Sequence, residues 1–173
     1  MLNIINFLLK ENLVFTYLNQ SEDESTLNQI LNEIINSAAG LRNAIIIDDT
    51  GITIASRAKF TLKNIDEVTS AEKIGAISGA VFTAAEEQGQ ILGYGSINLQ
   101  ITEYNKGMLF SINLENGSLC LATDLDVQIG FIKAMLKKWA PKITHVLKRY
   151  LKSDQKGIKE ELKDLFSMNT LEP

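Results

Sequence analysis

The sequence is poor in the residues that build covalent or metal-held scaffolds. Its 173 residues include one cysteine, Cys120, and one histidine, His145. A lone cysteine cannot form a disulfide framework, and it favours a reducing, cytoplasmic setting. A single histidine, expected to face solvent, and a single cysteine also argue against a transition-metal cluster. We therefore expect the chain to fold around a hydrophobic core alone.

Motifs for chemistry are scarce as well. The GxxxxGK[ST] loop that cradles phosphates does not occur, so the protein is not expected to bind GTP itself. The glycines of residues 93–95 fit a kink at a strand entry. The acidic pairs Asp48-Asp49 and Asp124-x-Asp126 fit turn and helix-cap roles. The sequence thus predicts a protein that is not an enzyme and has no cofactor, metal or catalytic residue.

Long hydrophobic runs are also missing. Residues 2–18 are rich in large apolar side chains, but Lys10, Glu11 and Asn12 interrupt them. A bilayer span needs about 18 to 20 mainly apolar residues, and a secretory signal needs a basic first part. We expect this segment to form a helix, or a helix and a strand, packed on the domain or on a second copy. A peripheral membrane anchor is the alternative.

Charge is distributed unevenly along the chain. The formal net charge is −4, from 17 basic and 21 acidic residues. Residues 127–153 carry seven of the basic residues and no acid, which leaves ten basic against 21 acidic residues, a net charge of −11, elsewhere. This balance argues against a nucleic-acid binder and allows contact with an acidic partner or an anionic membrane. The candidate contacts are Lys138, Lys142, Lys148, Arg149 and Lys152.

Two local patterns predict how the folded domain begins. Ser21 and Glu24 form a capping box, and the apolar residues behind it repeat at helical spacing. A hairpin follows at residues 42–57, with β-branched residues in both arms and Gly51 at the position of its turn that tolerates positive φ. Since an isolated hairpin is marginal in water, a larger sheet is expected.

A second capping box at residues 69–72 predicts a helix to about Gln88. Its core face is expected to carry Ile74, Ile77, Val81 and Ala84. The adjacent strip is small apart from one aromatic ring, and comprises Gly75, Ser78, Gly79 and Phe82. Glycine inside a helix costs about 1 kcal/mol relative to alanine, so close packing should offset the cost. The neighbour is either the chain's own sheet or a helix of a second copy.

The second half predicts a three-stranded antiparallel meander and a closing helix. Strands are expected within residues 96–102, 108–114 and 119–123, the last two joined by an Asn116-Gly117 turn. Pro141 is expected to break or kink the helix that follows, or to start a new one. A linker is expected at 153–157, before a last helix. The buried stripe of the closing helix is expected to hold Val127, Phe131, Ile132, Met135, Leu136 and Trp139.

The order of elements predicts an α+β fold, in which a five-stranded antiparallel sheet, hairpin plus meander, is flanked by helices. Residues 27–138 then resemble the Roadblock family of dynein light chains and GTPase regulators. The resemblance lies in the hairpin IIIDDTGITIAS, the helix IGAISGAVFTAAEEQG and the segment TDLDVQIGFIKAMLKK, in that order. It implies a profilin-like or longin-like architecture. We expect a Roadblock-like domain at 21–140, an N-terminal apolar extension at 1–20 and a C-terminal helical extension at 141–173.

The resemblance also implies partners. Roadblock domains usually dimerise through the middle helix and the first meander strand, and their dimers commonly serve as platforms for Ras-like small GTPases. We therefore expect a homodimer, or a heterodimer with a related Roadblock domain, that binds a small Ras-like GTPase and modulates its nucleotide cycle or localisation. The expected interface residues are Gly75, Ser78, Gly79, Phe82, Glu86, Asn98, Gln100 and Thr102.

Two other readings of the sequence remain open. A structural light chain would bind an extended peptide along a sheet edge, whatever the nucleotide state of a GTPase. A small-molecule sensor would need a closed pocket with convergent polar groups. An arginine finger is not expected, because Arg42 and Arg57 would be neighbours across the hairpin and available to carboxylates.

Overall fold

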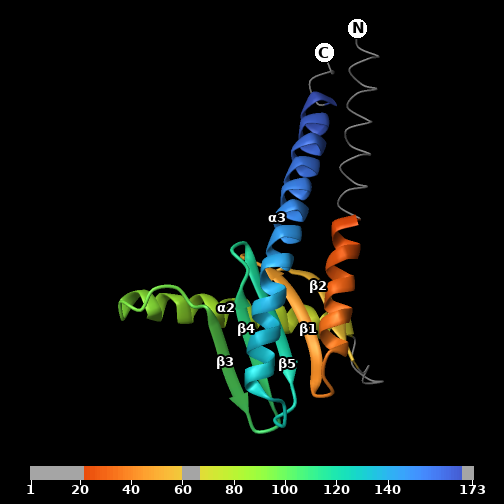
Figure 1. The fold of residues 1–173 in the computed structure, drawn as a ribbon. Coiled ribbons are helices and arrows are strands. Elements are labelled where there is room, and N and C mark those ends of the chain that lie inside the picture. The colour runs from red at the N-terminus through yellow and green to blue at the C-terminus, as the bar shows by residue number, and fades with distance from the viewer. Residues whose placement is uncertain (1–21, 60–66, 169–173) are drawn as a thin grey trace. The chain divides into compact units, whose positions relative to one another are not determined.

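The computed structural model describes the backbone of residues 22–59 and 67–168, and the side chains of residues 22–59 and 71–153 (Figure 1). The chain divides into two compact units, Leu27–Thr144, and Met1–Thr26 together with His145–Pro173. Along the chain lie a first helix of residues 22–36, β1 (Leu41–Asp48), β2 (Thr53–Ala58), α2 (Glu67–Ile91), β3 (Leu99–Tyr104), β4 (Gly107–Asn113), β5 (Gly117–Thr123) and α3 (Ile129–Met168).

The five strands form one antiparallel sheet in the order β2-β1-β5-β4-β3, which confirms the predicted α+β fold. The hairpin and the meander meet where β1 pairs with β5, with Ile45 opposite Cys120. Gly51, in the hairpin turn, has a φ of 87°, as its place in the turn predicts. The edges of the sheet are β2 and β3.

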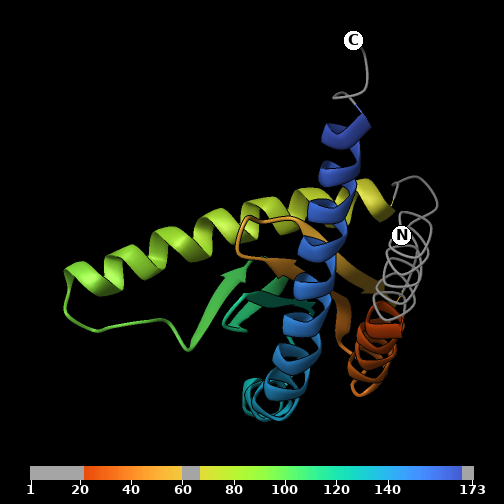
Figure 2. The same ribbon diagram turned by 90° about the horizontal axis from the view of Figure 1, so that it is seen from above.

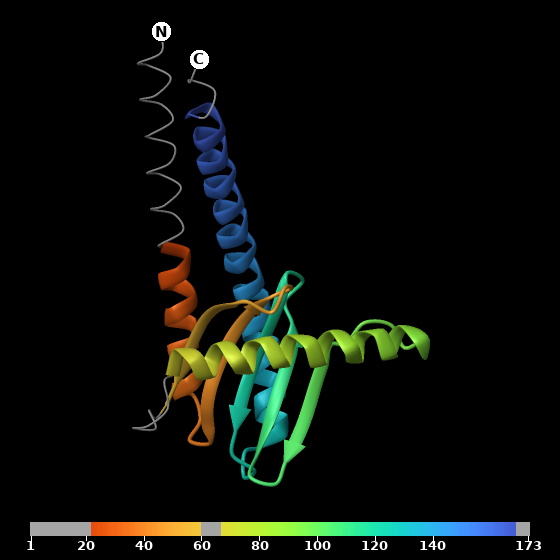
Figure 3. The same ribbon diagram turned by 180° about the vertical axis from the view of Figure 1, so that it is seen from behind.

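Helices cover both faces of the sheet in the unit Leu27–Thr144. Residues 27–36 and the first part of α3 lie on one face, and α2 crosses the other (Figures 2 and 3). Alternation along β1 sends its side chains to both layers. On the α2 side, Ile45, Ile47, Ala71 and Cys120 form a buried cluster. On the other side the buried residues include Leu27, Leu31 and Ile34 of the first helix and Ile132, Leu136 and Ile143 of α3.

The unit formed by both ends of the chain holds a partly buried ion pair. The Nη2 atom of Arg149 donates to the Oδ1 atom of Asp23 at 2.6 Å. The side chain of Asp23 is 8% exposed and that of Arg149 is 54% exposed. The pair therefore joins the first turn of the first helix to the part of α3 that follows His145.

The predicted break at Pro141 and the predicted linker at 153–157 are wrong, because α3 runs as one helix through both. Pro141 has no backbone N–H, so the carbonyl of Lys137 lacks the hydrogen bond that it would otherwise accept within the helix. Since Pro141 and Lys137 are both exposed, water can take the place of that donor. Phe131 is also misplaced by the predicted stripe: it is 45% exposed, whereas Ile132, Met135, Leu136 and Trp139 are buried.

The predicted start of the middle helix is late, since α2 begins at Glu67. The capping box at Ser21 lies outside the described residues, as does the apolar segment 1–20. His145 is exposed, as expected.

Candidate partner interface

The inner face of α2 packs closely on the hairpin. A Cβ atom at Gly75 would lie 2.5 Å from the Thr53 Oγ1 atom and 2.8 Å from the Ile47 Cγ2 atom, and one at Gly79 would lie 3.3 Å from the Gly51 Cα atom. Contacts under 3.0 Å do not occur for real Cβ atoms without a shift of the neighbour. The two glycines thus let the helix backbone approach the chain's own sheet.

This packing settles which neighbour the small-residue strip meets. Ser78 is 5% exposed and Phe82 is 8% exposed, so both are buried within the chain. The predicted core face is wrong in three of its members, because Ile77 is 65% exposed, Val81 is 47% exposed and Ala84 is also exposed. The glycines permit the helix to approach the sheet closely on this face, and Ile77 and Val81 lie on the face that points away from it.

The outer face of α2 is an apolar strip, here named the outer strip. Its residues follow helical spacing and are all exposed: Ala76, Ile77, Ala80, Val81 and Ala84. A helix on the surface of a monomer normally presents polar residues there. The exposed apolar residues continue at and after the end of α2, with Ile91 at 82%, Leu92 at 61% and Tyr94 at 82% exposure. Figures 2 and 3 show that this end of α2 extends beyond the sheet.

From this helix end the chain runs back to β3, which is an edge strand of the sheet (Figure 2). Among the described residues β3 pairs with β4 alone, so its other edge has no strand partner. The carboxylate of Glu86 accepts a hydrogen bond from the Ile97 backbone at 3.1 Å, which ties α2 to the segment before β3. Of the predicted interface residues, Glu86, Asn98, Gln100 and Thr102 therefore lie in or near this edge, whereas Gly75, Ser78, Gly79 and Phe82 face the chain's own sheet.

The five predicted basic contacts do not act as one group. Lys138 and Lys142 lie over the ring of Trp139, at 5.1 and 4.8 Å from its centroid. Arg149 is held by Asp23. Lys148 and Lys152 are exposed, one turn apart. The residues most available for an acidic partner in this set are therefore Lys148 and Lys152.

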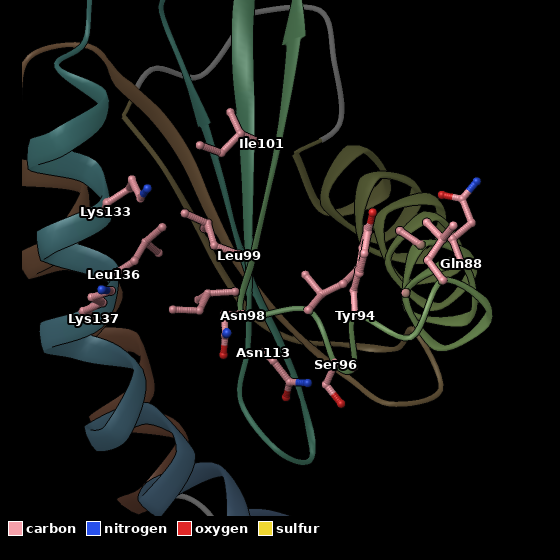
Figure 4. A pocket seen from close by; sticks show the side chains of 16 residues that line it. Gln88, Tyr94, Ser96, Asn98, Leu99, Ile101, Asn113, Lys133, Leu136 and Lys137 are labelled. Carbon is pink, nitrogen blue, oxygen red and sulfur yellow. The ribbon is translucent and has the colours of Figure 1, made fainter.

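A cleft of about 940 Å³ lies beside β3 and is lined by that strand, the end of α2 and the first part of α3 (Figure 4). Lys133, Leu136 and Lys137 of α3 stand on one side, and Leu99 and Ile101 of β3 on the other. The sequence analysis did not predict this cleft. The basic stretch of residues 127–153 includes both lysines, but the sequence does not show that they face a strand.

The groups considered for chemistry have structural roles. The Oδ1 atom of Asp48 accepts hydrogen bonds from the backbone of Thr50 at 2.9 Å and of Ile52 at 2.8 Å, as its predicted turn role requires. Asp124 forms an ion pair with Arg42, and α3 begins at Ile129. The prediction that Asp124 or Asp126 caps this helix is therefore wrong, because neither residue directly precedes it. No group of three metal-ligating side chains occurs among the described residues.

Cys120 lies beneath α2 in a small buried polar cluster. Its sulfur is 3.3 Å from the Oγ atom of Ser111, and Ser78 of α2 and Ser118 also bond to it. Burial raises the pKa of the Cys120 thiol, and the hydrogen bonds from these serines oppose part of the rise. A buried thiol of raised pKa is a packing residue, as its place in a strand predicts.

Comparisons with known proteins were made for the whole chain. No model of a known protein family matches it. A protein of Methanocaldococcus jannaschii, named only as uncharacterized, is 29% identical over 120 residues, which are 69% of this chain and 95% of that protein. A Roadblock/LC7 domain from Streptomyces avermitilis superposes with a TM-score of 0.63 at 11% identity, covering 70% of this chain and 97% of that one. MglB in a tetrameric arrangement superposes with a TM-score of 0.65 at 16% identity, covering 74% and 92%.

The sheet order and the helices define the class of the protein. It is an α+β protein with a five-stranded antiparallel sheet between helical layers. More narrowly, it has the Roadblock/LC7 fold, so the resemblance found in the sequence is confirmed at the level of the fold. Within the part of the chain that was searched, no helix combines the length and the apolar character that a membrane crossing requires.

Proposed function

We propose that the protein is a dimeric, non-enzymatic regulator or scaffold that binds a small Ras-like GTPase. Two observations carry the proposal: the outer strip of α2 is an exposed apolar helix face, and the edge strand β3 has one side without a strand partner among the described residues. Exposed apolar patches of this kind mark interaction sites. The Roadblock/LC7 fold supports the same interpretation, because this chain resembles the Roadblock family in the order and spacing of its sequence motifs.

A second copy of the chain suits this surface. Two β3 edges pairing side by side would supply the backbone hydrogen bonds that each edge lacks, with Gln100 and Thr102 at the junction. The same approach would bring the projecting end of α2 over the other copy. MglB, which has a similar fold, has been solved in a tetrameric arrangement, which supports assembly of copies.

The GTPase is proposed from the family resemblance. Roadblock dimers commonly serve as platforms for Ras-like GTPases, and such a platform needs no catalytic group of its own. The parts of the outer strip that a second copy leaves uncovered would contact the GTPase and modulate its nucleotide cycle or its localisation. We place the protein itself in the cytoplasm.

Dimer formation can be tested by charge placed on the outer strip. Two lysines at Ile77 and Val81 (I77K/V81K) should convert the dimer to a monomer in sedimentation velocity, because burying two unpaired ammonium groups is unfavourable. The control L125K/I129K makes the same change at two exposed residues outside α2, 46% and 43% exposed, and should stay dimeric. A wild-type protein that is monomeric at all concentrations would contradict the proposal.

GTPase binding is tested separately. Ras-like GTPases from the same genome are loaded with GDP or with a non-hydrolysable GTP analogue, and binding and hydrolysis rates are measured. Binding that depends on the nucleotide supports a regulator. Binding that ignores the nucleotide would replace it with the structural light-chain reading.

A further inference from the structure

The charged residues that line the cleft between β3 and α3 are all basic. Two of its lining residues, Lys133 and Lys137, are basic, and none of the lining residues is acidic. The contrast is informative because acidic residues outnumber basic ones in the chain as a whole, 21 to 17. Both lysines are exposed, and neither makes an ion pair or hydrogen bond with another residue in the described part of the chain.

Both lysines lie on the side of α3 that borders the cleft. They are four residues apart on α3 and so lie one turn apart on the same side of that helix. Figure 4 shows both on the side of α3 that borders the cleft, together with Leu136. Two ammonium groups in this arrangement match two carboxylates on one ligand segment.

The rest of the cleft is apolar with a few amides. Leu99 and Ile101 of β3 face α3 across it, and Ile101 is 38% exposed. Asn98 and Asn113 add amide groups that can bond to a peptide backbone. The opening is wide and its volume, about 940 Å³, is at the upper end of the range for small-molecule pockets.

We propose that this cleft binds an acidic, apolar peptide segment of a partner protein, with carboxylates on Lys133 and Lys137 and apolar side chains on Leu99 and Ile101. Charge complementarity identifies the occupant: an acidic segment gains from both lysines, whereas a basic or neutral one leaves them unpaired. The inference goes beyond the proposed function, because it requires a single copy of the chain and no GTPase.

The test uses a displayed library of random twelve-residue peptides selected on the full chain, with removal of peptides that also bind the K133E/K137E variant. The recovered peptides should carry two or more carboxylates beside apolar residues. Labelled peptides, followed by fluorescence anisotropy, should lose about tenfold or more in affinity for K133E/K137E, and should bind more weakly at high salt.

The matched control is K73E/K106E, which makes the same change at two exposed lysines outside the cleft, one in α2 and one in the turn between β3 and β4. It should keep the affinity within about twofold, a difference expected of charges that do not touch the ligand. If K133E/K137E does not fold, K133Q/K137Q replaces it and should still lose most of the affinity. The I77K/V81K variant should bind the peptides as wild type does, which separates this inference from dimer formation.

Three results would overturn the inference. The selection recovers no peptide that distinguishes wild type from K133E/K137E, or recovers basic or wholly polar peptides. Alternatively, K73E/K106E loses as much affinity as K133E/K137E, which would show that only the overall charge matters.

Discussion

The two helical layers that cover the sheet differ in where their large apolar side chains lie. On one side, the first helix and α3 bury their apolar residues, such as Leu31 and Leu136, against the sheet. On the other side, α2 buries small residues and leaves Ile77, Val81 and Ile91 exposed. The first layer buries most of its large apolar side chains within the chain, although Ile129 and Phe131 of α3 are exposed. The second layer has a helix that is apolar on both faces, which indicates that its outer face serves contact with another molecule.

The largest expected effect lies in the layer formed by the first helix and α3. Leu31→Ala removes a side chain of 0% exposure and should lower the free energy of unfolding by about 2–5 kcal/mol, from lost transfer energy and the cavity left behind. Ile77→Ala, at 65% exposure, should change it by about 0.5 kcal/mol or less in protein dilute enough to be monomeric. Urea unfolding followed by fluorescence of the single tryptophan, Trp139, measures both. Equal losses would remove the distinction between the layers.

A smaller effect is expected beneath α2. Gly75→Ala should lower the unfolding free energy by about 1–3 kcal/mol, because the added methyl group forces Ile47 or Thr53 to shift in a packed site. Gly130, at the start of α3, has no atom within 4 Å of the position of an added Cβ apart from its chain neighbours and the backbone of its own helix. Gly130→Ala should therefore be neutral or stabilise by up to about 1 kcal/mol. Calorimetric unfolding of both variants makes the comparison; a stabilising Gly75→Ala would show that α2 sits loosely.

The smallest effect concerns pH. Because burial raises the pKa of the Cys120 thiol, the folded state favours the protonated form more than the unfolded state does. The stability that this difference contributes is present below the thiol's ordinary pKa, about 8.5. It is lost as the pH rises through the higher pKa of the folded protein. Wild type should thus lose more stability than Cys120→Ala between about pH 8 and pH 10. Identical pH profiles would mean that the thiolate forms as easily under α2 as in water.

Most elements of the fold could be predicted because their signals are local. The turn at Gly51 and the Asn116-Gly117 turn each specify a hairpin within a few residues. The pairing of β1 with β5 joins segments about 70 residues apart, for which one sequence holds no comparable signal. The order of strands, and hence which edges stay open, therefore came from the structure.

The site was predicted less well, for two physical reasons. A periodicity argument assigns the larger apolar side chains to the core, and it fails for α2 because close approach at Gly75 reverses the choice. The lysines of the cleft, Lys133 and Lys137, were visible as charge, but their orientation depends on how α3 lies over β3 and β4. By contrast, Pro141 was overrated as a helix breaker, since its missing hydrogen bond falls on an exposed face.

The central position of β1 has a consequence for the making of the protein. β1 is complete at Asp48, yet one of its two partners, β5, begins at Gly117. A ribosome adds about 5–20 residues per second, so for several seconds the strand that carries Ile45, Ile46 and Ile47 has one edge open. During that interval the nascent chain presents an apolar β-edge of the kind that recruits other strands. The central pairing of the sheet, between β1 and β5, can therefore be completed only after residue 123 has been synthesised.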